Sequence, residues 1–282
     1  MRPLIRPQLP QHLRGRYPAA SLLMSAFGHF CSFCGRPLLD EAWVWNARTG
    51  DCLEQNSFDT EDWSHLYLLD YNCHLAHQEN SALAPQALLL PTATGVFSPR
   101  VGQSLSYSMR PLTRVLLDDR QLPVESELVP SVVITGHTDA ARATIDYFQL
   151  NTRYYDESGQ ELRVPLQDHL ALEDRRLEQR TQAWIDAAEF ALRVLRAFSF
   201  SMGPVVIEQF RLVAGLTGFW SSSVTAAATV LYSQRILRRI FFEATEPAGS
   251  DILIAGLKPA EAADFHGNGG YHTFPGSRNV FD

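Results

Sequence analysis

The feature that most constrains the fold is a pair of cysteines, Cys31 and Cys34, followed directly by Gly35. A two-residue gap lets both sulfurs converge on one ion, and glycine permits the backbone that closes such a turn. Cys73 is the natural third ligand. Because structural zinc wants four tetrahedral ligands, Asp70, three residues before Cys73, is the expected fourth. The spacing predicts a small module stapled by structural zinc.

The fourth ligand has alternatives. Cys52, His74 or His77 could take the place of Asp70, since thiolates and imidazoles also bind zinc. A second interpretation is that the knuckle holds no metal and that its cysteines are buried as small apolar side chains.

The composition is that of a folded protein without low-complexity segments. The 282 residues are 45% hydrophobic and 20% charged, which allows one large domain or two ordinary ones. The net charge of −7 excludes a global attraction to nucleic acid, so any such binding needs a local basic patch. The best candidate is the amino-terminal arm, where four arginines precede the first acid; its other interpretation is a solvated tail. These arginines are Arg2, Arg6, Arg14 and Arg16.

The cysteine count and the hydropathy pattern indicate the cellular compartment in which the protein is expected. Four cysteines, two of them at knuckle spacing, favour a reducing compartment over a disulfide framework. The first residues lack the apolar stretch of a signal peptide, so a cytoplasmic protein is expected. The uncharged run 212–234 contains serines, threonines and glycines, which favours a buried helix over a membrane span.

The periodicity predicts an α+β chain that is mostly helical. We expect a basic arm and first helix over 1–30, the small metal module over 31–110 and a helical domain over 111–282. Within these parts, helices are expected at 17–30, 137–151, 166–198, 204–215 and 219–244, and a strand at 42–48.

Metal-stapled modules with two strands and a helix include nucleases, whose first strand ends in an acid followed by a histidine. The acid holds a divalent cation and the histidine takes a proton from the attacking water. Here Trp45 and Asn46 stand at those positions. Neither is an anionic ligand or a base near neutral pH, so the sequence predicts that cleavage has been lost.

If the protein does cut, other residues must act. The candidates are His65, in the expected loop, and His74 and His77, on the expected helix. Asp51 or Glu54 could also have taken over a role by local rearrangement. Only in that case do we expect Mg²⁺ or another divalent cation beside the zinc.

The polar side of the expected helix 166–198 carries Arg175, Arg176 and Arg180. These arginines could contact phosphate. Alternatively, they form ion pairs with the acids of the same helix.

The order of these motifs resembles the HNH (ββα-metal) endonuclease family, in particular the bacterial branch encoded beside ATPases in anti-phage defence loci (Septu-type proteins). The resemblance covers most of the chain, although each short motif is weak by itself. It is carried by Met1-Arg-Pro-Leu, Tyr17 to Ala20, Phe30-Cys-Ser-Phe-Cys-Gly35, Val44-Trp-Asn-Ala47, Trp63 to His74, Leu90 to Phe97, Ala143 to Asn151, Asp174 to Ala187 and Gly218-Phe-Trp-Ser221.

The resemblance implies an HNH-like module with a degenerate catalytic motif. Three hypotheses follow from it. The first is a silent relative that binds nucleic acid or assembles with a partner, such as an ATPase or an active nuclease subunit. The second is a working DNA endonuclease with rearranged residues, and the third is a zinc-stabilised interaction protein without a nucleic acid partner.

Overall fold

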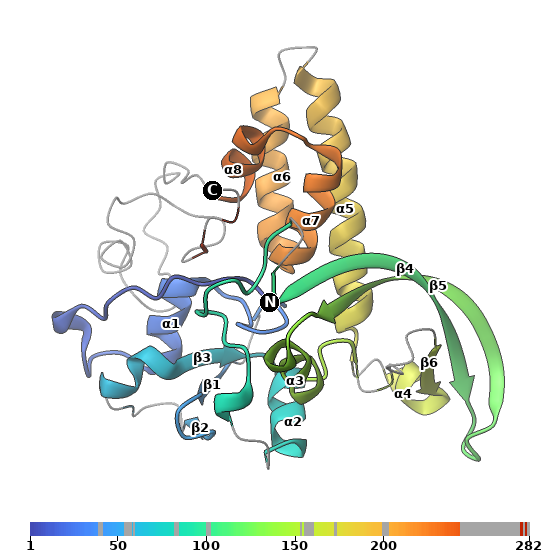
Figure 1. Cartoon of the computed structure of the whole chain (residues 1–282), viewed down its shortest axis with the longest axis horizontal. Coiled ribbons are helices and arrows are strands. Elements are labelled where there is room, and N and C mark those ends of the chain that lie inside the picture. Colours follow the sequence, from blue (N-terminus) through green and yellow to red (C-terminus); the bar gives the residue numbers. More distant parts are fainter. Residues whose placement is uncertain are drawn as a thin grey trace.

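The protein is an α+β structure, shown as a computed structural model in Figure 1. The structure describes residues 1–38, 42–53, 58, 60–81, 85–99, 103–152, 154, 161–171, 174–198, 203–242, 277–278 and 280.

The first helix, α1 (Ala19–Phe27), lies within the range expected for it. It begins after Pro18, whose fixed φ suits the residue before a helix. It ends at Gly28, which has a φ of 80° that a residue with a Cβ adopts only with strain. The 3₁₀ turn η1 (Gln11–Leu13) precedes it in the arm.

A small antiparallel sheet and a helix follow the knuckle. Strand β1 (Trp43–Asn46) lies between β2 (Cys52–Leu53) and β3 (Leu66–Leu69), and α2 (Tyr71–Glu79) begins directly after β3. All four residues of β3 are buried, which fixes the sheet against the core. The 3₁₀ turns η2 (Thr60–His65) and η3 (Pro85–Ala87) flank this unit.

The long hairpin of β4 (Leu105–Leu117) and β5 (Pro123–Gly136) corrects the expectation that 111–282 is a helical domain. It curves away from the other elements in Figure 1. The sequence hides it because Pro111 and Pro130 sit opposite each other in its ladder, and proline inside a strand pattern argues against a strand. Both are tolerated because β5 is an edge strand and β4 pairs with its other neighbour, β6 (Glu161–Pro165), only from Thr113 onward.

The remaining helices correct the expected boundaries. The predicted helix 166–198 is two helices, and the predicted helix 219–244 breaks at 231–233, where Ser233 caps the next helix. The helix expected at 137–151 is confirmed, with Thr138 accepting from the backbone N–H of Ala141 at 3.2 Å. The bounds are α3 Asp139–Tyr147, α4 Leu166–Ala171, α5 Arg176–Phe198, α6 Gly203–Thr217, α7 Trp220–Val230 and α8 Gln234–Phe241.

One main core joins the arm, the small sheet and the helices α5 to α8, which lie together in Figure 1. Its buried members run from Met1 to Phe241, so it crosses both predicted domain boundaries. Strand β4 runs through the predicted boundary at residue 110. Within the described ranges, every helix is too short or too polar to cross a bilayer.

Candidate metal centre

The structure brings together the four predicted ligands. The donor atoms of Cys31, Cys34, Asp70 and Cys73 all lie within 4.8 Å of one another, and all four residues are buried. No other group of three or more such side chains in the described part of the chain gathers in this way. Cys52, His74 and His77 therefore lie outside the cluster.

The knuckle has a closed hydrogen-bonded form. The N–H of Gly35 donates to the carbonyl of Cys31 at 3.1 Å, and the N–H of Cys31 donates to the carbonyl of Arg36 at 2.9 Å. The N–H of Arg36 points at the sulfur of Cys34, 3.4 Å away. Gly35 has a φ of +83°, and a Cβ there would lie 3.3 Å from the Cα of Phe219, so glycine is required on two grounds.

Asp70 is placed by the start of α2. Its Oδ1 accepts from the backbone N–H of Cys73 at 3.0 Å, which makes it the N-cap of the helix. Its Oδ2 is buried and has no hydrogen-bond partner among the described residues. The nearest cationic atom, Nη1 of Arg36, lies 3.8 Å away, which is too long for a hydrogen bond. Oδ2 is therefore left to bind an ion.

The donor set fits a metal ion such as zinc. Tetrahedral zinc with bonds of about 2.3 Å to sulfur places neighbouring sulfurs about 3.8 Å apart, so the observed spread requires only a small contraction. Three sulfurs and one carboxylate oxygen also fill the four positions of a structural site. No position is left for a reacting water, so the site is suited to holding the fold together.

The electrostatics of the cluster call for a cation. Burial raises the pKa of the Cys34 and Cys73 thiols. Burial, and after it the neighbouring Cys31 sulfur, raises the pKa of Asp70 to about 6. Cys31 differs: burial raises its pKa, but the hydrogen bonds around its sulfur, foremost from the Cys34 and Cys73 thiols, together outweigh burial and lower its net pKa. The other three groups favour their protonated forms, and a divalent ion reverses this by displacing the protons.

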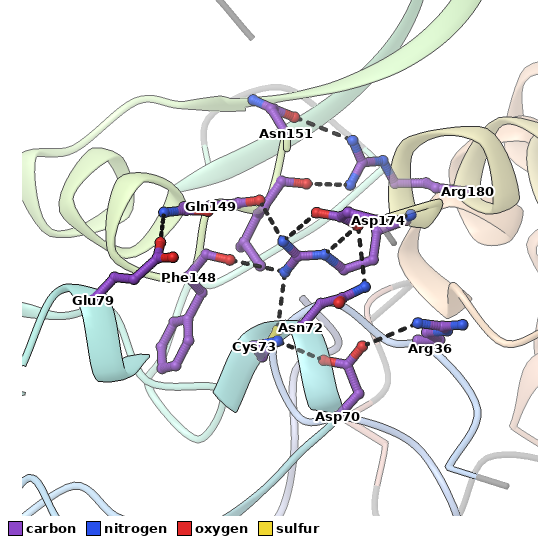
Figure 2. Close-up of polar contacts among 12 residues, drawn as sticks. Arg36, Asp70, Asn72, Cys73, Glu79, Phe148, Gln149, Asn151, Asp174 and Arg180 are labelled. Carbon is purple, nitrogen blue, oxygen red and sulfur yellow. Dashed lines mark hydrogen bonds and ion pairs between the residues drawn. The ribbon is translucent and has the colours of Figure 1, made fainter. Parts of the chain in front are cut away.

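A buried guanidinium lies against the cluster. Nη1 of Arg176 donates to the sulfur of Cys73 at 3.3 Å, and its Nη2 pairs with Asp174 at 2.7 Å. The same side chain donates to the carbonyls of Phe148 and Gln149, at 2.8 and 3.0 Å (Figure 2). Its 1% exposure means that these contacts replace all of its hydration. This role was not predicted, because no local pattern links residues so far apart in sequence.

Arg180, one turn further along α5, is also structural. It donates to the carbonyls of Val132 and Leu150, at 2.9 and 2.7 Å, and to Oδ1 of Asn151 at 3.2 Å. Figure 2 shows Arg180 and Asn151 facing each other. The expectation that Arg176 and Arg180 contact phosphate is therefore corrected, since both are buried and bound to protein atoms. Arg175 is exposed and lies 3.7 Å from Glu178, as its alternative interpretation expected.

The arginines of the amino-terminal arm also fall into a buried and an exposed group. Arg2 is buried and donates to the carbonyl of Phe27, and half-buried Arg6 donates to the carbonyls of Trp63 and Leu66 at 2.7 and 2.6 Å. These two arginines anchor the arm to the core, which corrects their assignment to a nucleic-acid patch.

Arg14 and Arg16 are the exposed arginines of the arm. Together with Arg175, they are the arginines predicted to contact nucleic acid that the structure places at the surface.

The strand positions of a nuclease acid and base are occupied by buried side chains. Trp45 is fully buried and meets Phe148 edge-on, with ring centroids 5.6 Å apart. Asn46 is 1% exposed, and its Oδ1 accepts from the backbone N–H of Arg48 at 2.9 Å. Its amide oxygen is thus used within its own turn.

The histidines of α2 contact other side chains. Nδ1 of His74 lies 3.4 Å from the sulfur of Cys52, and its ring stacks on Trp43 at 4.8 Å. Nδ1 of His77 lies 2.8 Å from the hydroxyl of Tyr147, and burial lowers the pKa of both histidines.

His65 is half-buried at the end of η2, apart from the metal-ligand cluster. Asp51 is exposed, and Glu54 falls outside the described residues.

No protein-family model, curated protein or solved structure shows a significant match to this chain. Function is therefore inferred from the geometry.

Proposed function

We propose that this protein is a zinc-stapled relative of the HNH endonucleases that has lost DNA cleavage and acts as a binding or assembly subunit. Support for the ancestry comes from the order of the parts. A cysteine knuckle precedes β1, an antiparallel strand follows, and the remaining two ligands open the helix α2. This is the arrangement that the resemblance implies for a ββα-metal module.

The observation that carries the loss of cleavage is the burial of Trp45 and Asn46. A hydrolytic metal needs an anionic ligand and an open coordination position, and the attacking water needs a base. At this end of β1 the chain offers an indole and an amide that is already bound to Arg48. Of the two candidates on the helix, His77 is buried against Tyr147, and His74 stacks on Trp43 and lies beside Cys52.

The remaining role is binding. Arg14, Arg16 and Arg175 are exposed and could meet phosphate, but the net charge of −7 opposes a general affinity for DNA. We propose a protein partner first, either an ATPase or an active nuclease subunit. DNA is the second candidate, through these three arginines.

Cleavage is tested with supercoiled plasmid and the purified protein in Mg²⁺, Mn²⁺ or Ni²⁺. The proposal expects no nicking above the level of a mock preparation. Nicking that His77→Ala abolishes, while the zinc content stays unchanged, would establish a working nuclease and overturn the proposal.

The two partner classes are separated by binding to duplex DNA at several salt concentrations. Phosphate contacts make the affinity fall steeply with salt, and each lost contact reduces the slope by about one. The triple variant Arg14→Gln, Arg16→Gln, Arg175→Gln should show whether such contacts exist. Weak binding that does not change with salt supports the protein partner.

A further inference from the structure

A cavity of about 690 Å³ lies away from the metal cluster, beside the root of the β4–β5 hairpin. Residues within 95–99 and 103–104, the start of β4, the residues before α3 and Thr225 of α7 line it. The wall includes apolar side chains and several hydroxyl groups. Its lining residues are Gly95, Phe97, Ser98, Pro99, Gln103, Ser104, Leu105, Ser106, Tyr107, His137, Thr138 and Thr225.

Two of these lining residues, Ser106 and His137, lie close enough to act as a nucleophile and its base. Oγ of Ser106 lies 2.8 Å from Nε2 of His137. Ser106 is half-buried and His137 is exposed, so the pair lies where solvent and a small molecule can reach it. A serine hydroxyl becomes a nucleophile when an adjacent imidazole can take its proton, and separations of 2.6–3.2 Å are those found in such pairs.

The backbone holds the pair in register. The N–H of His137 donates to the carbonyl of Ser104 at 2.8 Å, so the imidazole is tied to the strand that carries Ser106. The N–H groups of Ser104 and Leu105 donate in turn to the carbonyls of Gly95 and Val96, at 2.9 and 3.0 Å. These bonds join the segments at 95–96, 104–105 and 137 on one side of the cavity.

We propose that Ser106 and His137 form a nucleophilic site for acyl transfer from small neutral esters. The Oγ of Ser106 bonds to the acyl carbon while its proton passes to Nε2 of His137. The bond from the acyl carbon to the alcohol oxygen then breaks, and the alcohol leaves with the proton from His137. Water, activated by His137, attacks the acyl-serine, releases the carboxylic acid and restores the serine hydroxyl.

The lining defines the substrate class. The lining residues that the structure describes include no Asp, Glu, Lys or Arg, so this part of the wall offers a ligand no charged partner. Phe97, Leu105 and Pro99 supply apolar surface for an acyl chain. The side-chain amide of Gln103 is a polar group of this lining that can donate to a developing oxyanion.

The test uses the full chain, with a fluorophosphonate as covalent probe and p-nitrophenyl acetate as substrate. We expect a single adduct on Ser106 by peptide mass spectrometry and ester hydrolysis above the buffer rate. Ser106→Ala should abolish both, and His137→Asn should slow both by about 10²-fold or more. Ser108→Ala is the matched control, because it removes a half-buried hydroxyl two residues further along β4, and Ser108 is not among the described lining residues of the cavity.

The proposal is overturned if Ser106 is not labelled, or if it is labelled at an unchanged rate in His137→Asn. Folding does not confuse the outcome, since both residues are at the cavity surface and circular dichroism checks each variant. The test is also independent of the proposed nuclease ancestry, because zinc content and plasmid integrity are measured separately.

Discussion

The guanidinium of Arg176 donates a hydrogen bond to the sulfur of Cys73 at 3.3 Å. This contact joins the start of α5 to the start of α2, residues that are separated by 103 positions in the chain. It also makes the metal cluster part of the main core, since the same guanidinium binds the turn after α3. The Asp174 carboxylate completes the arrangement: burial raises its pKa, but the hydrogen bonds from Arg176 and the charge of its guanidinium together outweigh burial, and the net pKa is lowered.

Replacing Arg176 should therefore destabilise the protein strongly. Arg176→Met leaves the Asp174 carboxylate buried without its cation, and removing one partner of a buried pair typically costs about 3–5 kcal/mol. The measurement is the free energy of unfolding in urea, with zinc present in both samples. Arg175→Met, at the exposed neighbouring position, is the control and should change it by less than about 0.5 kcal/mol. Equal effects of the two variants would contradict the structural role of Arg176.

Zinc binding should depend on the cysteines of the cluster and not on Cys52, the cysteine outside it. We expect about one zinc per chain by plasma mass spectrometry in the wild type, and loss of most of it in Cys31→Ser. Cys52→Ser is the matched control, because Cys52 lies outside the cluster and contacts His74 instead. A wild type without zinc, or equal zinc in both variants, would favour the interpretation of the cysteines as apolar core residues.

Because of Asp70, the stability of the metal-free protein should depend on pH, and bound zinc should reverse the direction of this dependence. In the metal-free protein the Asp70 pKa of about 6 exceeds the ordinary value of 3.8, so the folded state keeps a proton that the unfolded chain has lost. The contribution of Asp70 to the free energy of unfolding is fully present below pH 4. It is lost as the pH rises through 6, a change of about 3 kcal/mol. With zinc the sign is opposite, since the ligands must be deprotonated and binding strengthens with pH.

The matched variant for this pH effect is Asp70→Asn, which preserves an N-cap for α2 while removing the titrating group. The difference in unfolding free energy between wild type and Asp70→Asn, both in EDTA, should change between pH 4 and 6. A constant difference would show that Asp70 titrates normally. Asp70→Ala should lose about 1 kcal/mol more by removing the cap as well.

His77 should matter for stability and not for cleavage. Its ring nitrogen lies 2.8 Å from the Tyr147 hydroxyl, and this pair connects α2 to α3. Tyr147→Phe should cost about 1 kcal/mol, and a double-mutant cycle with His77→Ala should show coupling of similar size. Additive effects of the two changes would mean that the contact contributes nothing to the fold.

The candidate site was largely predictable from the sequence, and the fold less so. The knuckle is local: two residues separate Cys31 and Cys34, and Gly35 has the φ that the turn needs. Asp70 and Cys73 are likewise three residues apart, which is the spacing of a helix cap and the first turn. In contrast, the β4–β5 hairpin was missed because Pro111 and Pro130 contradict the strand pattern locally. They are tolerated because β5 is an edge strand and because β4 pairs with β6 only from Thr113 onward, beyond Pro111.

The sequence by itself determined the three cysteines of the cluster and the absence of an acid and a base at Trp45 and Asn46, because both depend on residue identity and short spacing. It left Cys52, His74 and His77 as alternatives to Asp70, and the tertiary structure placed Asp70 beside the three cysteines. The tertiary structure decided what the arginines do. Arg176 and Arg180 have the same charge and helical spacing as surface residues would have, yet both are buried and bound to carbonyls from other segments. Whether a charged side chain meets solvent or a distant backbone is set by long-range packing, and no local pattern records that choice.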